Sequence, residues 1–202
     1  TDLVLGLHVK TGITESFLGG LTAGVLTKNN ITTYVYKPSQ PISTIKRHLI
    51  IIPKNAETEI GFPFWLLKIW NIGRNTGAKL QFYGHEKTIG VIKEIHSKHP
   101  IEAGFTVFED WDDFLILSRD IKPDEGLVII MSRERKISFQ NNMRNIPKYL
   151  NKYFSQNNFI LIYPMQLGVT GDDHDLTNPS IIEPLEKIDE LVKRIITLFR
   201  KK

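Results

Sequence analysis

The sequence predicts an α/β fold in which helices cover both faces of a doubly wound parallel sheet. Short runs of β-branched and aromatic residues alternate along the chain with longer segments of helical period, which is the pattern of βαβ units. The run from His48 to Pro53 is apolar on both faces, as a buried parallel strand should be. The order strand, turn, helix, strand of residues 3–38 also recurs loosely over residues 128–164. A repeat of this size indicates a duplicated domain.

The first unit, residues 1–38, is short. An apolar strand opens it, a helix is expected over Thr14–Thr27, and a second strand over Ile31–Tyr36. The prolines and sparse apolar side chains that follow predict a linker, which we assign to residues 39–46. Because the first copy of the repeat lacks everything that precedes the second copy, we expect the chain to begin in the middle of a domain.

A complete unit is expected over residues 47–165, with five strands and intervening helices. Gly77 is expected to end the helix that begins at Phe62, and Pro147 is expected in the first turn of its helix, where a proline loses no hydrogen bond. The predicted strands are 48–53, 79–83, 105–109, 126–131 and 158–163, and the predicted helices are 62–76, 86–97, 111–118 and 146–154.

The tail, residues 166–202, contains a polar loop and then an amphipathic helix over Pro179–Phe199, whose apolar residues form one stripe. Three placements are open for this helix: it covers the domain, it packs on a partner, or it lies on a membrane surface.

The composition narrows the function. The chain has 202 residues and no cysteine, which excludes disulfides, thiolate metal sites and cysteine nucleophiles. Its net charge is +4, with basic and acidic residues interleaved along most of the chain, so we expect a solvated surface and no nucleic-acid partner. No run approaches the roughly 18 apolar residues of a transmembrane helix, so the chain as given is expected to be soluble. We find no pattern typical of a metal site or a hydrolytic triad, and we expect no enzymatic activity.

Glycines surround the end of the first strand and the start of the next helix. In a parallel sheet ligands bind at this place, and backbone without side chains can approach a phosphate while helix amides point at it. The candidate nucleotide-binding residues are Gly6, Gly12, Gly19 and Gly20. Two interpretations are open: these glycines bind a phosphate, or they serve turns and packing.

The residues around these glycines resemble the end of a universal stress protein domain. That family has a nucleotide-binding pattern of Gly, two residues, Gly, nine residues, Gly and then Ser or Thr. Gly6 and Gly19 match the first and third glycines, but Val9 replaces the second and Gly20 replaces the hydroxyl residue. The resemblance implies a universal stress protein-like (adenine nucleotide alpha hydrolase-like) fold, with ATP or AMP as the ligand of an intact site. The departures predict a degenerate site, so we expect no cofactor.

The second copy departs further from the family pattern. Met131 replaces the first glycine, Glu134 replaces the second, and Asn55 stands where these proteins usually present an aspartate that contacts the nucleotide. These departures predict that the complete unit does not bind a nucleotide.

The segment from Thr33 to His48, together with Pro53 and Ile60–Trp65, is similar to the C-terminal region of bacterial cation/proton antiporters of the sodium/hydrogen exchanger type. In that group, tandem stress-protein-like domains follow a membrane transporter. The resemblance implies a noncatalytic regulatory domain on the cytoplasmic side of the inner membrane, a fragment of a longer protein, with the antiporter's membrane domain as its partner. The alternative is a free-standing universal stress protein that binds ATP or AMP.

The half unit leaves an exposed sheet edge, and such edges rarely stay unpaired. We therefore expect residues 1–38 to add to the complete unit or to a second chain, and we expect a homodimer.

Overall fold

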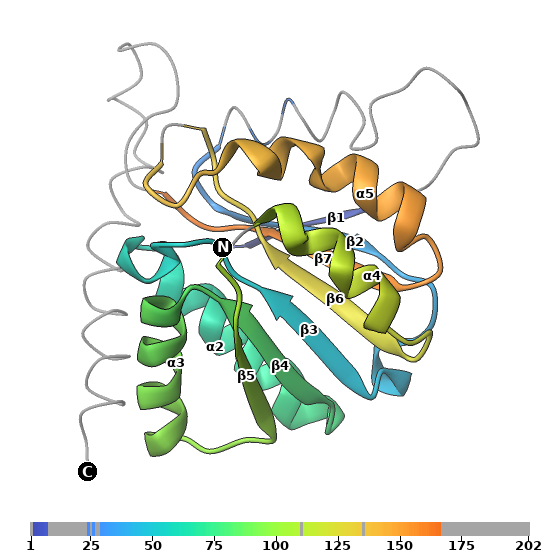
Figure 1. Ribbon diagram of the computed structural model, residues 1–202, viewed down its shortest axis with the longest axis horizontal. Helices are drawn as coiled ribbons and strands as arrows, with labels where there is room; N and C mark the ends of the chain where they lie inside the picture. The colour runs from blue at the N-terminus through green and yellow to red at the C-terminus, as the bar shows by residue number, and fades with distance from the viewer. Residues whose placement is uncertain are drawn as a thin grey trace.

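The computed structural model describes residues 2–7, 24, 26, 29–109, 111–134 and 136–166. These residues form one seven-stranded sheet with helices against both faces (Figure 1), which confirms the predicted α/β fold. The strands are β1 (Asp2–Gly6), β2 (Thr32–Lys37), β3 (Arg47–Ile51), β4 (Lys79–Gly84), β5 (Ala103–Val107), β6 (Glu125–Ile130) and β7 (Asn158–Tyr163). The helices predicted over residues 14–27 and 179–199 lie outside the described residues, except for positions 24 and 26.

The strands lie in the order β1-β2-β7-β6-β3-β4-β5. Every neighbouring pair is parallel except β2 and β7, which are antiparallel. The parallel sheet predicted for residues 47–165 is confirmed over β3–β7, and the first two strands join it through the antiparallel pair. From β3 the chain adds β4 and β5 in one direction and then returns to place β6 on the other side of β3. The sheet is therefore doubly wound, and its switch point lies between β3 and β6.

Two apolar layers hold the helices on the sheet. On one face, α2 (Phe62–Thr76) and α3 (Glu86–Lys98) pack Trp65, Ile69 and Ile92 against the central strands. The other face is covered by a 3-10 helix (Trp111–Ile116), α4 (Leu117–Asp120), a second 3-10 helix (Asn141–Asn145) and α5 (Ile146–Tyr153). Every residue of β6 and β7 is buried, because a strand between two helical layers has no face in solvent. No helix among the described residues is long and apolar enough to cross a bilayer.

The predicted helix ends are confirmed where a special residue marks them. Gly77 ends α2 with a φ of 71°, a left-handed conformation that favours glycine, and its amide donates to the Gly73 carbonyl. Pro147 lies in the first turn of α5. The helix predicted over 111–118 begins instead as a 3-10 helix, a conformation that the packing of its side chains favours. Side chains three residues apart are eclipsed in that conformation, so Trp111 and Phe114 both point into the core.

The edge strand β5 begins and ends two residues earlier than predicted. β5 covers Ala103–Val107 instead of residues 105–109. As an edge strand it pairs only with β4, and β4 ends at Gly84, directly opposite Val107. Beyond Val107 no partner strand remains, so the ladder stops there.

The antiparallel pairing brings the two copies of the repeat side by side. Val35 and Leu161 each lie three residues before the proline that closes its strand, Pro38 or Pro164, and they face each other at the middle of the pair. The remaining pairs are Thr33–Tyr163, Tyr34–Ile162, Tyr36–Ile160 and Lys37–Phe159. β1 then lies parallel to β2, as β6 lies parallel to β7. The two copies are thus related by an approximate two-fold axis beside Val35 and Leu161.

The sheet corrects the alignment of the two copies by one residue. Gly6 faces Tyr36 in the first copy, and Ile130 faces Ile162 in the second. Ile130 is therefore the counterpart of Gly6, whereas sequence comparison had placed Met131 there. The alignment drifts because the connection between the two strands of a copy has 25 residues (7–31) in the first copy and 27 residues (131–157) in the second.

The segment predicted as a linker packs on the domain. Ile45 is buried, and the Asn158 side chain accepts hydrogen bonds from the amides of Ser39 and Gln40 while donating to the Gln40 carbonyl at 2.7 Å. Lys37, at the end of β2, donates to the carbonyl of Asn157 at 3.3 Å. These contacts fix the connection between the two repeats.

Candidate functional site

The carboxyl ends of β3 and β6 mark the switch point, where doubly wound sheets bind their ligands. After β3 the chain turns at Asn55, whose φ of 65° is left-handed, and continues into the 3-10 helix Ala56–Thr58. After β6 it passes through the buried residues Met131, Ser132 and Arg133. We call this place, outside the carboxyl ends of β3 and β6, the switch-point crevice.

A carboxylate from the chain itself lies in this crevice. Glu59 Oε1 accepts hydrogen bonds from both the backbone amide (3.3 Å) and the hydroxyl of Ser138, in the loop after β6. Glu59 Oε2 accepts a hydrogen bond of 2.8 Å from Gln166 Nε2, beyond the end of β7. Ser138 and Gln166 are buried, and Glu59 is partly buried. One side chain thus joins the segments that follow three adjacent strands.

The chain also covers the start of α2, which follows the β3 loop. Gly61 precedes the helix, and a Cβ at this position would lie 2.6 Å from Pro164 Cβ and 2.9 Å from the Met165 carbonyl oxygen. The segment Pro164–Gln166, which we call the strap, therefore crosses in direct contact with the backbone at the helix start. Glycine is required here for close approach by the protein's own chain, and the strap occupies the space in which an outside ligand would approach these amides.

Arg133 joins the second repeat to the first. Its guanidinium donates to the carbonyls of Leu26 and Ile31, the latter at 3.1 Å, and the residue is only 9% exposed. Burial lowers the pKa of Arg133, because desolvation disfavours the cation. The strap adds a neighbouring contact, since the Gln166 amide donates to the Asn30 carbonyl at 2.9 Å. Residues just ahead of β2 are therefore held by groups that follow β6 and β7.

The predicted glycine site does not meet the switch-point crevice within the described structure. Gly6 ends β1 at the edge of the sheet, and two strands, β2 and β7, separate it from β6. A Cβ at Gly6 would meet no described atom within 4 Å, so the packing of the described residues does not require glycine there. Gly12, Gly19 and Gly20 lie outside the described residues.

Acidic side chains also gather at the start of α3, beside the crevice. Glu57 accepts a hydrogen bond of 2.7 Å from the Thr88 hydroxyl, and Glu109 pairs with His85 at 3.0 Å while accepting from the Glu86 amide. Carboxylates at a helix N-terminus satisfy amides that have no partner within the helix. Within the described residues, no cluster of three or more His, Asp or Glu side chains could hold a metal ion.

Sequence reasoning missed Glu59, Ser138, Gln166 and Arg133. None of them belongs to a motif, and the hydrogen-bonded partners are far apart in the chain. A usable signal exists, because Glu59, Ser138 and Gln166 are polar residues that follow the carboxyl ends of three strands, and such residues meet along one edge of a parallel sheet.

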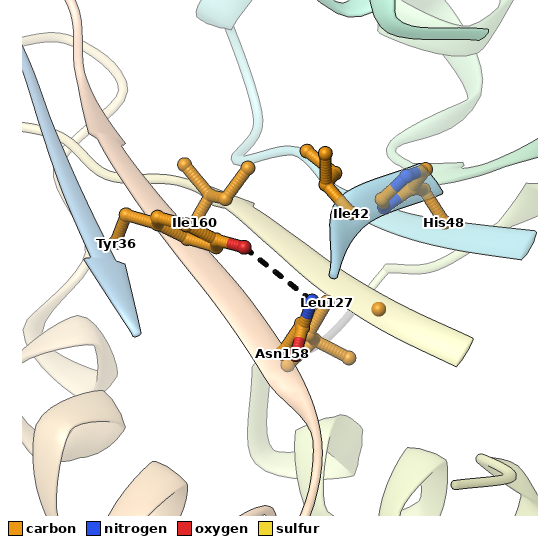
Figure 2. Close-up of a pocket in the computed structure, with 7 residues that line it drawn as sticks. Tyr36, Ile42, His48, Leu127, Asn158 and Ile160 are labelled. Atoms are coloured by element: carbon orange, nitrogen blue, oxygen red, sulfur yellow. Dashed lines mark hydrogen bonds between the residues drawn. The ribbon is translucent and has the colours of Figure 1, made fainter. Parts of the chain in front are cut away.

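A small hollow lies at the opposite end of the strands from the crevice, where β3, β6 and β7 begin. Its lining includes His48, Ile42, Tyr36 and Asn158, and Figure 2 shows the Tyr36 hydroxyl directed at the Asn158 side chain, with His48 beside Ile42. The space is too narrow for a water molecule. The His48 ring lies against Gly126, where a Cβ would come within 2.8 Å of Nδ1. This hollow is therefore a packing feature and not a ligand cavity.

His48 makes the stability of the protein depend on pH. The residue is 2% exposed, neither ring nitrogen has a described hydrogen-bond partner, and burial lowers its pKa to about 4. Unfolded, the group titrates near 6.5, so the unfolded chain takes up the proton first as pH falls. The free energy of unfolding should therefore decrease by about 3 kcal/mol between about pH 6.5 and 4, at 1.36 kcal/mol per pKa unit.

Urea unfolding of the wild type and of His48→Leu across this pH range measures the effect. The substitution removes the titrating group but fills a similar volume, so the variant should show a correspondingly flatter profile. Equal slopes for the two proteins would show that other groups dominate this pH range.

Comparison with known proteins finds no family model that matches the chain and no curated protein with significant similarity to it.

Proposed function

We propose that this chain is a noncatalytic regulatory domain on the cytoplasmic side of a membrane cation/proton antiporter, built from universal stress protein-like units. The observation that carries the noncatalytic part is the switch-point crevice, which holds the carboxylate of Glu59 and lies beside the strap. Proteins that bind small molecules in doubly wound sheets keep this place open for the ligand. The antiporter part is supported by the resemblance of residues 33–48, Pro53 and residues 60–65 to the C-terminal region of such transporters.

The architecture offers surfaces on which another protein chain could bind. The two outermost strands, β1 and β5, each have one free edge within the described structure, and Val4 and Val107 on these strands are 66% and 50% exposed. Free edges and exposed apolar side chains are features through which another chain can bind. We infer that the partners are the membrane domain of the antiporter and a second copy of this chain.

Calorimetric titration of the purified chain with ATP and with AMP tests the noncatalytic part. Because the Glu59 carboxylate occupies the crevice and the strap covers the start of α2, no binding is expected at micromolar nucleotide. Thermal unfolding of the same sample confirms that the protein is folded during the titration. Saturable micromolar binding would instead favour a free-standing nucleotide-binding stress protein.

The antiporter part is tested in the gene and in transport. Several long apolar segments encoded upstream of Thr1 are expected, and a short soluble half-domain there would contradict the proposal. In the full-length protein, deletion of residues 39–202 should leave exchange measurable in membrane vesicles while shifting its dependence on pH or cation concentration. Unchanged dependence on both would rule out a regulatory role.

A further inference from the structure

We propose that the switch-point crevice is a carboxylate-binding site, which Glu59 occupies as an internal ligand. The donors are the amide and hydroxyl of Ser138 and the side-chain amide of Gln166. A carboxylate from another molecule can take the place of Glu59 when that side chain is absent or displaced. This inference does not depend on the antiporter assignment.

The donors lie in the interior of the protein. Ser138 is 2% exposed and Gln166 is 7% exposed, so water has little access to either side chain. The backbone amide of Gln166 is bound to the Asn30 carbonyl at 2.9 Å, which fixes the residue from its main chain. Buried donors without an acceptor are costly, typically about 1–3 kcal/mol each. The fold therefore maintains a set of donors that requires an acceptor.

The arrangement matches a carboxylate better than a phosphate. Ser138 donates to one oxygen of Glu59 and Gln166 donates to the other, so the two oxygens of a planar group are each satisfied. No lysine or arginine is bonded to Glu59 among the described contacts. A phosphate carries more charge and more oxygens than these donors can satisfy, and its recognition usually relies on such cations.

Glu59 competes with any outside carboxylate because it is tethered to the same chain. A tethered group acts at an effective concentration on the order of millimolar or higher. An outside carboxylate must therefore exceed this concentration or belong to a ligand that makes additional contacts. The wild-type protein should accordingly ignore small carboxylates, and removal of Glu59 should reveal the site.

Glu59→Ala is the sharpest test, because the deleted atoms correspond to an acetate ion. The variant should unfold more readily than the wild type, and sodium acetate should stabilise it in a saturable way. At acetate ten times above its dissociation constant, the unfolding equilibrium constant of the variant should fall about elevenfold. Sodium chloride at the same ionic strength should not do this, and the wild type should not respond specifically to acetate.

Two controls locate the acetate. Glu59→Ala combined with Ser138→Ala should lose most of the acetate effect, because the site then lacks a hydroxyl donor. Glu134→Ala removes an exposed carboxylate, 67% exposed and paired with Arg144, and should show no acetate effect. Equal responses to acetate and chloride in Glu59→Ala would overturn the proposal, and so would an acetate response that survives in the double variant. Phosphate that stabilises as well as acetate would overturn the carboxylate preference.

A variant that fails to fold in plain buffer still gives an answer. Glu59→Ala is then refolded from urea in acetate or in chloride of equal ionic strength, and the soluble folded yield is compared. A higher yield in acetate is expected. Equal failure in both salts would overturn the proposal, provided that Glu59→Gln, which keeps the side-chain volume, folds under the same conditions.

Discussion

A chain that starts at residue 39 is expected to pair with a second copy through β7. Removing β2 leaves one edge of β7 without partners, although this strand is buried along its whole length. β2 is the repeat counterpart of β7 and already pairs with it about an approximate two-fold axis. The β7 strand of another copy can therefore take the same place, with Leu161 facing Leu161. Light scattering should show twice as many subunits in the truncated protein as in the full chain.

Cysteine crosslinking tests the register of that pairing, because the protein has no cysteine of its own. Facing residues of an antiparallel pair have Cα atoms about 4.5–5.5 Å apart, a distance that a disulfide spans. Leu161→Cys in the truncated chain should therefore crosslink on oxidation. Tyr163→Cys serves as the control, because the two copies of that position would be four residues out of register, about 13 Å apart. A truncated chain with unchanged subunit number and stability would contradict the pairing.

Arg133→Ala is expected to lower the free energy of unfolding by about 4 kcal/mol. The substitution removes two hydrogen bonds from a charged donor, at about 1.5 kcal/mol or more each, and leaves the carbonyls of Leu26 and Ile31 without this donor. Loss of the buried side-chain stem adds roughly another 1 kcal/mol. Denaturant unfolding measures the total, and hydrogen exchange should show faster opening of the amides in β2.

Arg144→Ala is the matched control. Arg144 follows in the same connection between β6 and β7, but its side chain is 60% exposed and pairs with the exposed Glu134. Exposed ion pairs contribute about 0–1 kcal/mol, so this variant should unfold almost like the wild type. Equal losses in the two arginine variants would show that Arg133 has no special role between the repeats.

The sequence predicts the helices and strands of this fold better than it predicts which strands pair with one another. The apolar run of β3 and the residues Gly77 and Pro147 act locally, so their strand and helix ends could be located from neighbouring residues. The antiparallel pairing of β2 with β7 could not, because hydrophobic alternation does not specify which edges meet. The hydrogen bonds in the crevice could not be predicted for a related reason. Glu59, Ser138 and Gln166 come together only after three strands have paired, and each looks alone like an ordinary loop residue.

For His48 the sequence predicts the place in the fold but not the pKa of the side chain. A histidine inside an apolar strand was predicted to be part of that strand, which is confirmed. Its lack of a hydrogen-bond partner depends on Ile42 and Gly126 from other segments, which close around the ring. The depressed pKa is therefore a property of packing and cannot be read from neighbouring residues.

The symmetric pairing of β2 with β7 has a consequence for how such a chain can diverge. Two identical molecules that met in this way would share every substitution at both ends of the pair. Once both strands belong to one polypeptide, the two ends can change separately. Here Lys37 lies over the ring of Phe159 at one end, while Thr33 faces Tyr163 at the other. Covalent linkage thus allows a junction between two similar strands to carry different side chains at its two ends.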